Sequence, residues 1–161
     1  MTRQLWAPWR LEYIGEAHEQ DGCVFCAEAA GELGDQSLTV QRGERGFVLL
    51  NKFPYASGHL MIASVRHLGE LSDLTSDEAA ELHDLTTQSI AALRAVYAPH
   101  AFNVGWNLGQ VAGGSISAHL HEHVVPRWSG DTNFMPVLAD VKVVPEHLLA
   151  TRDRLRAAWP D

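Results

Sequence analysis

The sequence has little cysteine, no long apolar run and a shortage of positive charge. Only two of its 161 residues are cysteines, Cys23 and Cys26, which excludes a framework of several disulfides. No apolar stretch reaches the roughly 20 residues that a membrane-spanning helix needs. The first six residues also lack the apolar core of a signal peptide. We therefore expect a cytoplasmic protein that does not associate with membranes.

The charge balance excludes one class of partner. Twelve Lys and Arg residues stand against twenty Asp and Glu residues, for a formal net charge of −8. Non-specific binding to nucleic acid depends on a basic field, so we expect no nucleic-acid partner. A small phosphorylated substrate is compatible with this charge, because a local cluster of His and Arg can outweigh the global charge.

The length and the regularity of the chain indicate one folding unit. A chain of 161 residues, 46% of them hydrophobic, is about one domain and can bury a core. It shows no internal repeat, low-complexity tract or linker. We predict a single domain over residues 1–161, in which residues 1–22 form an N-terminal arm rich in aromatic side chains.

Local patterns predict an α+β domain with a mostly antiparallel sheet. The clearest helix begins after Thr75, in a sequence typical of helix caps, and ends at Pro99. A short helix is expected after Cys26 and a terminal helix from Pro145. Alternating or β-branched runs between turn signals predict strands at residues 38–42, 47–51, 59–63, 101–108 and 141–144.

Three histidines at two-residue spacing are the strongest functional pattern: His119, His121 and His123. In a strand, such positions point to one face at steps of roughly 6–7 Å. The β-branched pair that follows favours a strand, which Pro126 is expected to end or to place at a sheet edge. The row of imidazoles suits either metal binding or attack by a neutral imidazole on phosphorus. Three ligands to one tetrahedral ion are disfavoured, because neighbouring positions on a strand diverge.

A glycine-rich turn precedes the three histidines. Gly109, Gly113 and Gly114 allow backbone N–H groups to approach an anion, and Ser115 adds a hydroxyl donor. By itself such a turn is more often a hairpin connection. Its position directly before the histidines favours phosphate chemistry.

The two cysteines are separated by two residues, Val24 and Phe25. This loop is too short for a disulfide to stabilise the fold usefully. A redox dithiol and half of a zinc site are both compatible with the spacing, and the pair alone does not decide between them.

A family resemblance covers most of the chain. The stretch over residues 119–125 resembles the signature of the histidine triad family of nucleotide hydrolases and transferases, in which three histidines alternate with apolar residues. Residues 47–51 and 57–62 resemble its nucleotide-binding strands, and residues 107–115 resemble its phosphate-contacting turn. The resemblance implies a fold with about five antiparallel strands, a long helix and a C-terminal helix. It also implies an enzyme that forms a homodimer through the long helix and an edge strand.

The resemblance assigns roles residue by residue. His121 matches the family nucleophile, which becomes nucleotidylated. His119 and His123 match the flanking histidines, which contact phosphate oxygens or hold the geometry, and His59 matches a supporting histidine. Substrate contacts to the ribose and to the phosphates are implied for Asn51, Asn107, Gly114 and Ser115.

The resemblance also bears on the cysteines. Many bacterial members with a Cys-x-x-Cys pair near the N-terminus bind structural zinc. The implied ligands are Cys23, Cys26, His67 and His119, and no organic cofactor is implied. His119 would then belong both to the catalytic strand and to the zinc site.

Residues 5–10 and 126–134 resemble the bacterial diadenosine tetraphosphate phosphorylases of this family. Those enzymes use inorganic phosphate as the second acceptor and produce ADP and ATP. A dinucleoside polyphosphate hydrolase or a purine nucleoside phosphoramidase that releases AMP is the alternative within the family. A non-catalytic nucleotide-binding module is the alternative of another class.

Glu122 departs from the family pattern, which has an apolar residue between the second and third histidines. Its side chain is predicted to face away from the histidines, towards the helices. A buried carboxylate without a partner is costly. We therefore expect either local exposure or a partner such as an arginine or a histidine.

Overall fold

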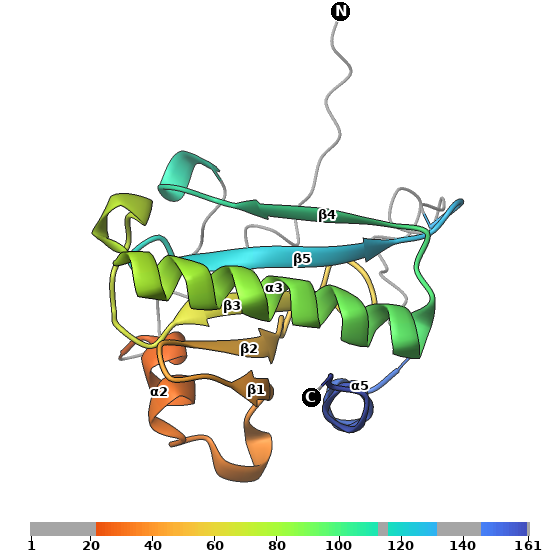
Figure 1. Cartoon of the computed structure of the whole chain (residues 1–161). Helices are drawn as coiled ribbons and strands as arrows, with labels where there is room; N and C mark the ends of the chain where they lie inside the picture. Colours follow the sequence, from red (N-terminus) through yellow and green to blue (C-terminus); the bar gives the residue numbers. More distant parts are fainter. Residues whose placement is uncertain (1–21, 113–115, 132–145, 161) are drawn as a thin grey trace, which may run out of the picture.

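The computed structural model describes residues 22–112, 116–131 and 146–160. Within these ranges, five antiparallel strands form one sheet in the order β1-β2-β3-β5-β4, accompanied by three α-helices (Figure 1). The predicted α+β fold class is confirmed. The strands are β1 (Thr39–Arg42), β2 (Gly46–Leu50), β3 (Leu60–Ser64), β4 (Ala101–Trp106) and β5 (His121–Arg127). The helices are α2 (Val24–Ala30), α3 (Ser76–Tyr97) and α5 (Leu148–Ala157).

Several predicted features lie outside the described residues. They are the arm up to residue 21, the glycine-rich turn from Gly113 to Ser115, the strand near residues 141–144 and the start of the terminal helix at Pro145. None of the helices in the described ranges is long and apolar enough to span a membrane.

The long helix α3 begins where its sequence predicts. The Thr75 hydroxyl accepts a hydrogen bond from the Glu78 N–H at 3.2 Å, and the Glu78 carboxylate accepts one from the Thr75 N–H at 2.8 Å. This reciprocal capping box satisfies two N–H groups that a helix start leaves unpaired. At the other end, Ala98 adopts a left-handed conformation (φ 45°) directly before Pro99, which cannot continue the helix.

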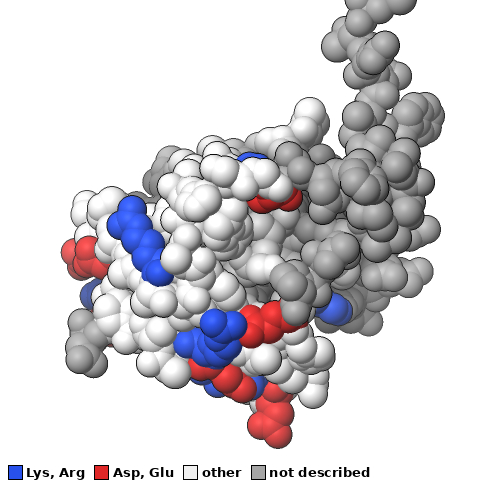
Figure 2. All heavy atoms as spheres, turned by 90° about the vertical axis from the view of Figure 1, so that its right-hand side faces the viewer, with Lys and Arg blue, Asp and Glu red and all other residues white. Residues whose placement is uncertain are grey.

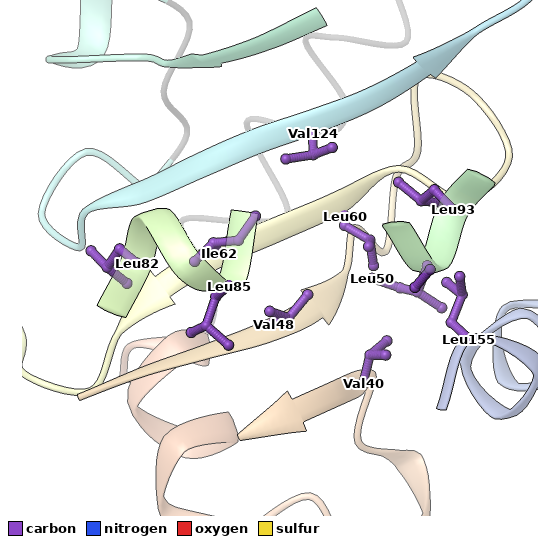
Figure 3. Packing of buried hydrophobic residues seen from close by; sticks show 11 residues of the cluster. Val40, Val48, Leu50, Leu60, Ile62, Leu82, Leu85, Leu93, Val124 and Leu155 are labelled. Carbon is purple, nitrogen blue, oxygen red and sulfur yellow. The ribbon is translucent and has the colours of Figure 1, made fainter. Parts of the chain in front are cut away.

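Helices α3 and α5 cover one face of the sheet. Alternate strand residues project from β2, β3 and β5 towards the leucines of α3, and a leucine of α5 completes the cluster at one side (Figure 3). Burial of each such side chain contributes about 1.5–3 kcal/mol. This cluster is the main core: Val40, Val48, Leu50, Leu60, Ile62, Leu82, Leu85, Ala92, Leu93, Val124 and Leu155.

The opposite face of the sheet carries the histidines. In the register of β3 with β5, Met61 lies opposite His123 and Ala63 lies opposite His121. A second cluster of buried apolar residues forms on this face, and Phe25 brings the short helix α2 onto it. The catalytic face predicted from the spacing is therefore partly covered by the helix that follows Cys23.

Pro126 does not end its strand, since it lies inside β5, which runs between β3 and β4. Its predicted place at a sheet edge holds locally. Pairing between β3 and β5 stops at Val124. The main chain of Arg127 faces the β4 side, since its carbonyl accepts a hydrogen bond of 2.9 Å from the His100 N–H. The main-chain groups of successive residues point to opposite neighbouring strands, so those of Pro126 point to the β3 side. The pairing with β3 does not reach Pro126, so the missing N–H of proline removes no hydrogen bond between strands.

Glu122 faces α3, as predicted, but its partner is neither an arginine nor a histidine. The hydroxyl of Thr86, a buried residue of α3, donates to the Glu122 carboxylate. Glu122 is half-buried, so both expectations hold in part: the site is locally open and the carboxylate is hydrogen-bonded.

The visible surface is electrostatically mixed. On the face shown in Figure 2, the described Lys and Arg side chains lie close to Asp and Glu side chains instead of forming one broad positive patch. Away from that face, in the turn between β1 and β2, Arg45 lies within 4.0 Å of Glu44, Asp77 and Glu81. Nucleic-acid binding would need a continuous basic surface.

Candidate active site and metal centre

The ring of His121 is held in one tautomer by the main chain. Its Nδ1 lies 2.7 Å from the carbonyl oxygen of His119, which can only accept, so Nδ1 carries the proton and Nε2 keeps a lone pair. The side chain is 8% exposed. Burial lowers the pKa of His121 below its ordinary 6.5, while the bond to the carbonyl acts in the opposite direction. A neutral imidazole with an available Nε2 is the form that attacks phosphorus.

Two aromatic rings enclose the ring of His121. The ring centroid of Phe25, from α2, lies 4.7 Å away with an interplanar angle of 32°. The ring of His123 meets it edge-on, with a centroid distance of 5.0 Å and an interplanar angle of 75°. With Nδ1 bonded as well, the orientation of the His121 ring is determined from three directions.

A hydrogen-bond chain that starts at the backbone determines the tautomer of His123. The N–H of Tyr55 donates to Nδ1 of His59 at 3.0 Å, so the proton of His59 sits on Nε2. That Nε2 lies 3.0 Å from Nδ1 of His123, which therefore accepts. The proton of a neutral His123 must then sit on Nε2, on the side of the ring that faces Asn107.

His123 remains neutral over a wide pH range. Burial lowers its pKa to about 4, and the neighbouring His121 contributes to the shift. Its Nε2 lies 3.2 Å from Nδ2 of Asn107, and a half-turn of this carboxamide would present its oxygen to the N–H. His123 is thus a neutral N–H donor beside His121.

The loop between β2 and β3 positions His59. Gly58 has a φ of 77°, and a Cβ there would lie 2.9 Å from Cδ2 of Leu93, so only glycine fits without displacement. At the start of the loop, the side-chain oxygen of Asn51 accepts from the Phe53 N–H at 2.9 Å, and its Nδ2 lies 3.4 Å from Nδ1 of His59. Asn51 therefore lies beside the histidine cluster, where a ribose contact is predicted.

The predicted zinc ligands converge on one point. The ligand atoms of Cys23, Cys26, His67 and His119 all lie within 4.8 Å of one another. Nδ1 of His119 is 3.3 Å from Sγ of Cys23 and 3.6 Å from Sγ of Cys26, and Nδ1 of His67 is 3.2 Å from Sγ of Cys26. Zinc bonds of 2.0–2.3 Å in a tetrahedron place ligands roughly 3.3–3.8 Å apart, and these three pairs, at 3.2–3.6 Å, lie close to that spacing, within a set that spans up to 4.8 Å.

The protonation states also suit a metal ion. Nε2 of His119 lies 2.7 Å from the carbonyl oxygen of Ser64 and donates its proton there, so the lone pair on Nδ1 faces the sulfurs. Burial raises the pKa of Cys26, and the neighbouring Cys23 raises it further. Without a metal these effects favour the neutral thiol of Cys26, and a bound divalent ion would stabilise the two sulfurs as thiolates by neutralising their charge.

The structure divides the predicted site residues into two groups. His121, His123, His59, Asn51 and Asn107 lie together on the face of the sheet that carries the histidines. His119 precedes β5 and turns its ring to the cysteines, so the three histidines are not one row of equivalent groups. Gly114 and Ser115 lie outside the described residues.

Sequence reasoning missed two residues at this site, Phe25 and Tyr55. Phe25 lies against His121, and its position between the two cysteines was the available signal. Tyr55 contributes its main-chain N–H to His59, which no side-chain pattern reveals.

Comparisons with known proteins agree with this geometry. The family described as the HIT domain matches residues 34–130. A protein named AP-4-A phosphorylase from Mycobacterium tuberculosis is 42% identical over 164 aligned residues, which cover 98% of this chain and 84% of that protein.

Solved structures share the fold. A zinc-bound histidine triad family protein from Mycobacterium smegmatis superposes with a TM-score of 0.69 at 25% identity, over 85% of this chain and 92% of that one. A HIT family protein from Bacillus anthracis superposes with a TM-score of 0.60 at 26% identity, over 68% of this chain and 75% of that one.

The identity to the phosphorylase extends over nearly the whole chain and marks this protein as an enzyme, as the sequence predicts. The matched family segment contains the three histidines, His59 and His67. The chain belongs to the histidine triad (HIT) family.

Proposed function

We propose that this enzyme is a diadenosine tetraphosphate phosphorylase that works through a covalent His121–nucleotide intermediate. The observation that carries the proposal is the bond of 2.7 Å from Nδ1 of His121 to the His119 carbonyl, which leaves Nε2 as the nucleophile. In the first step, the Nε2 lone pair attacks the α-phosphorus and the N–P bond forms. The P–O bond to the β-phosphate breaks, and its electron pair leaves with ATP.

The proton on Nε2 of His123 supports departure of the leaving group. This N–H donates to the bridging or a non-bridging oxygen as negative charge develops there. Asn107, next to Nε2 of His123, is placed to contact the same phosphates, and Gly114 and Ser115 are proposed to add donors. Asn51 is proposed to bind the ribose.

In the second step, an oxygen of inorganic phosphate attacks the phosphorus of the His121–AMP intermediate. The N–P bond breaks, its electron pair returns to Nε2, and ADP is released. The identity to the mycobacterial AP-4-A phosphorylase supports phosphate as the acceptor. If water attacks instead, the product is AMP and the enzyme is a hydrolase. A phosphoramidase would release AMP from an adenosine phosphoramidate.

We also propose that Cys23, Cys26, His67 and His119 hold one structural zinc ion. The ion would supply a cross-link between the start of α2, the segment after β3 and the segment that leads into β5. The zinc-bound relative supports this identity of the metal. No step of the proposed reaction passes through the ion.

The remaining proposals concern assembly and location. A cytoplasmic homodimer is proposed, in which the exposed edge strand β4 pairs with its copy. Val104 of this strand is 45% exposed, and an apolar residue exposed on an edge strand is typical of a surface that pairs with another chain. Light scattering should give twice the mass of one chain.

Product analysis tests the reaction. Purified protein is incubated with diadenosine tetraphosphate, with and without inorganic phosphate. ADP that forms only with phosphate supports the phosphorylase, whereas AMP formed regardless of phosphate assigns a hydrolase. The His121→Ala variant should be folded and inactive, and the exposed α3 variant His83→Ala should be fully active. Turnover by His121→Ala would overturn the covalent route.

A further inference from the structure

We infer that Phe25 is a positioning residue for the nucleophile His121, and that the metal centre acts on the nucleophile by holding Phe25 against it. This inference rests on the proposed function of His121. It assigns a second task to the Cys-x-x-Cys segment beyond binding an ion. The segment places an aromatic ring in the catalytic face of the sheet.

The contacts of Phe25 are with the histidines of both sites. Its ring is 4.7 Å from that of His121 and 5.2 Å from that of His119, measured between centroids. Its side chain is 1% exposed and is one of the largest fully buried side chains. A ring this closely packed leaves its neighbour no room to rotate.

The position of Phe25 depends on the two cysteines that flank it. Cys23 is the N-cap of α2 but caps it with no side-chain hydrogen bond. Its sulfur instead faces His119 at 3.3 Å, and that of Cys26 faces His67 at 3.2 Å. The contacts of the two cysteines with His67 and His119 therefore hold the first turn of α2 against the sheet, and Phe25 lies within that turn.

The C-terminal half of α2 is held by hydrogen bonds that do not involve the cysteines. The carboxylate of Glu28, which is 2% exposed, accepts hydrogen bonds from Ser37, from the Leu38 N–H and from Thr39, at 2.5–2.8 Å. These bonds need no metal. Loss of the ion should therefore loosen the first turn, with Phe25, while the helix stays attached to β1.

Small changes in the orientation of His121 matter for its reaction. Its Nε2 must meet the phosphorus in line with the departing oxygen, and a misplacement of about 1 Å can cost on the order of 100-fold in rate. Phe25 contacts the imidazole and, at 1% exposure, presents almost no surface that a substrate could contact. Its loss should therefore lower kcat and leave KM nearly unchanged.

The test compares two phenylalanines of the same buried cluster. Phe47, also 1% exposed, lies on β2, and the strand β3 separates it from His121. The variants Phe25→Leu and Phe47→Leu thus remove similar buried surface, but only the first removes the contact with His121. For both full-length variants we would measure zinc per chain, kcat and KM, and the His121 ring resonances, assigned by their loss in His121→Gln.

The inference predicts that Phe25→Leu keeps its zinc, shifts the His121 resonances and lowers kcat by roughly 10- to 100-fold with KM within about threefold. Phe47→Leu should keep both the resonances and kcat. Unchanged His121 resonances in Phe25→Leu, or an equal loss of kcat in Phe47→Leu, would overturn it. The His121 resonances are measured without substrate. They therefore test the positioning role even if the wild-type enzyme turns over no dinucleoside polyphosphate.

The link to the metal has its own readout. Removal of the ion should shift the His121 resonances in the wild type more than in Phe25→Leu, because the variant has already lost the connecting ring. Equal shifts in the two proteins would show that the metal centre reaches His121 by another route and would overturn this part of the inference.

Discussion

Nε2 of His59 lies 3.0 Å from Nδ1 of His123, and the Tyr55 N–H on the other side of His59 decides which of these two nitrogens carries the proton. A backbone donor therefore determines that the Nε2 of His123 is protonated. This nitrogen faces the place where the proposed leaving group departs. The tautomer of His123, the proposed proton donor, is thus determined by His59, which is proposed only to support it.

Replacement of His59 by alanine should lower kcat by about 10- to 100-fold. His123 then loses the hydrogen bond that His59 donates to its Nδ1, which selects its tautomer. Steady-state kinetics with diadenosine tetraphosphate would measure the effect, with His83→Ala as the matched surface control. A His59→Ala enzyme that is folded and has the wild-type kcat would contradict the assigned tautomers.

Removal of the metal should lower the melting temperature, because metal-binding free energy adds to folding free energy when the unfolded chain holds no formed site. Scanning calorimetry with and without a strong chelator would measure this. Cys26→Ser should already be destabilised, and the chelator should lower its melting temperature little further. An equal chelator effect on both proteins would place the metal elsewhere.

Loss of the Thr86 hydroxyl should cost about 1–3 kcal/mol of unfolding free energy, since the half-buried carboxylate of Glu122 loses its hydrogen-bond donor. The variant Thr86→Val keeps the side-chain shape. Thr87→Val, one residue along and exposed, should change stability by less than about 0.5 kcal/mol. Urea unfolding of the two variants would measure the difference, and equal stability would show that Glu122 needs no partner.

The ion pair between Arg66 and Glu78 predicts a pH dependence of stability. The hydrogen bond from Arg66, helped by the Thr75 N–H, lowers the pKa of Glu78 from 4.5 to about 2. A lowered pKa contributes stability that is complete above pH 4.5 and is lost as the pH falls towards 2. Glu78→Gln should therefore melt below the wild type at pH 7, and the gap should narrow at pH 3.

Thermal melts at the two pH values would measure this, with the exposed variant Glu70→Gln as control. A gap between Glu78→Gln and the wild type that is constant from pH 7 to pH 3 would assign the effect to side-chain packing instead of charge.

Local signals were sufficient for the start of the long helix and for the five strands that the structure describes. The capping box at Thr75 and Glu78 predicts the start of α3, because a helix terminus satisfies its N–H groups with nearby side chains. The two-residue spacing of His121 and His123 predicts that they share a face, because the alternation of a strand is a property of the backbone. The placement of Glu122 on the reverse face follows from the same alternation.

The sequence by itself thus determined the strands, the long helix and which histidines share a face, since each depends on neighbours along the chain. Only the tertiary structure decided the partners. It places Thr86 against Glu122 and stops the pairing of β5 with β3 before Pro126. It also brings Phe25 to His121, 96 residues away along the chain. Such contacts depend on sheet order and on the packing of α2, which no local pattern encodes. The position of His121 on the strand is therefore predictable from its motif, but the aromatic ring of Phe25 that packs against it is not.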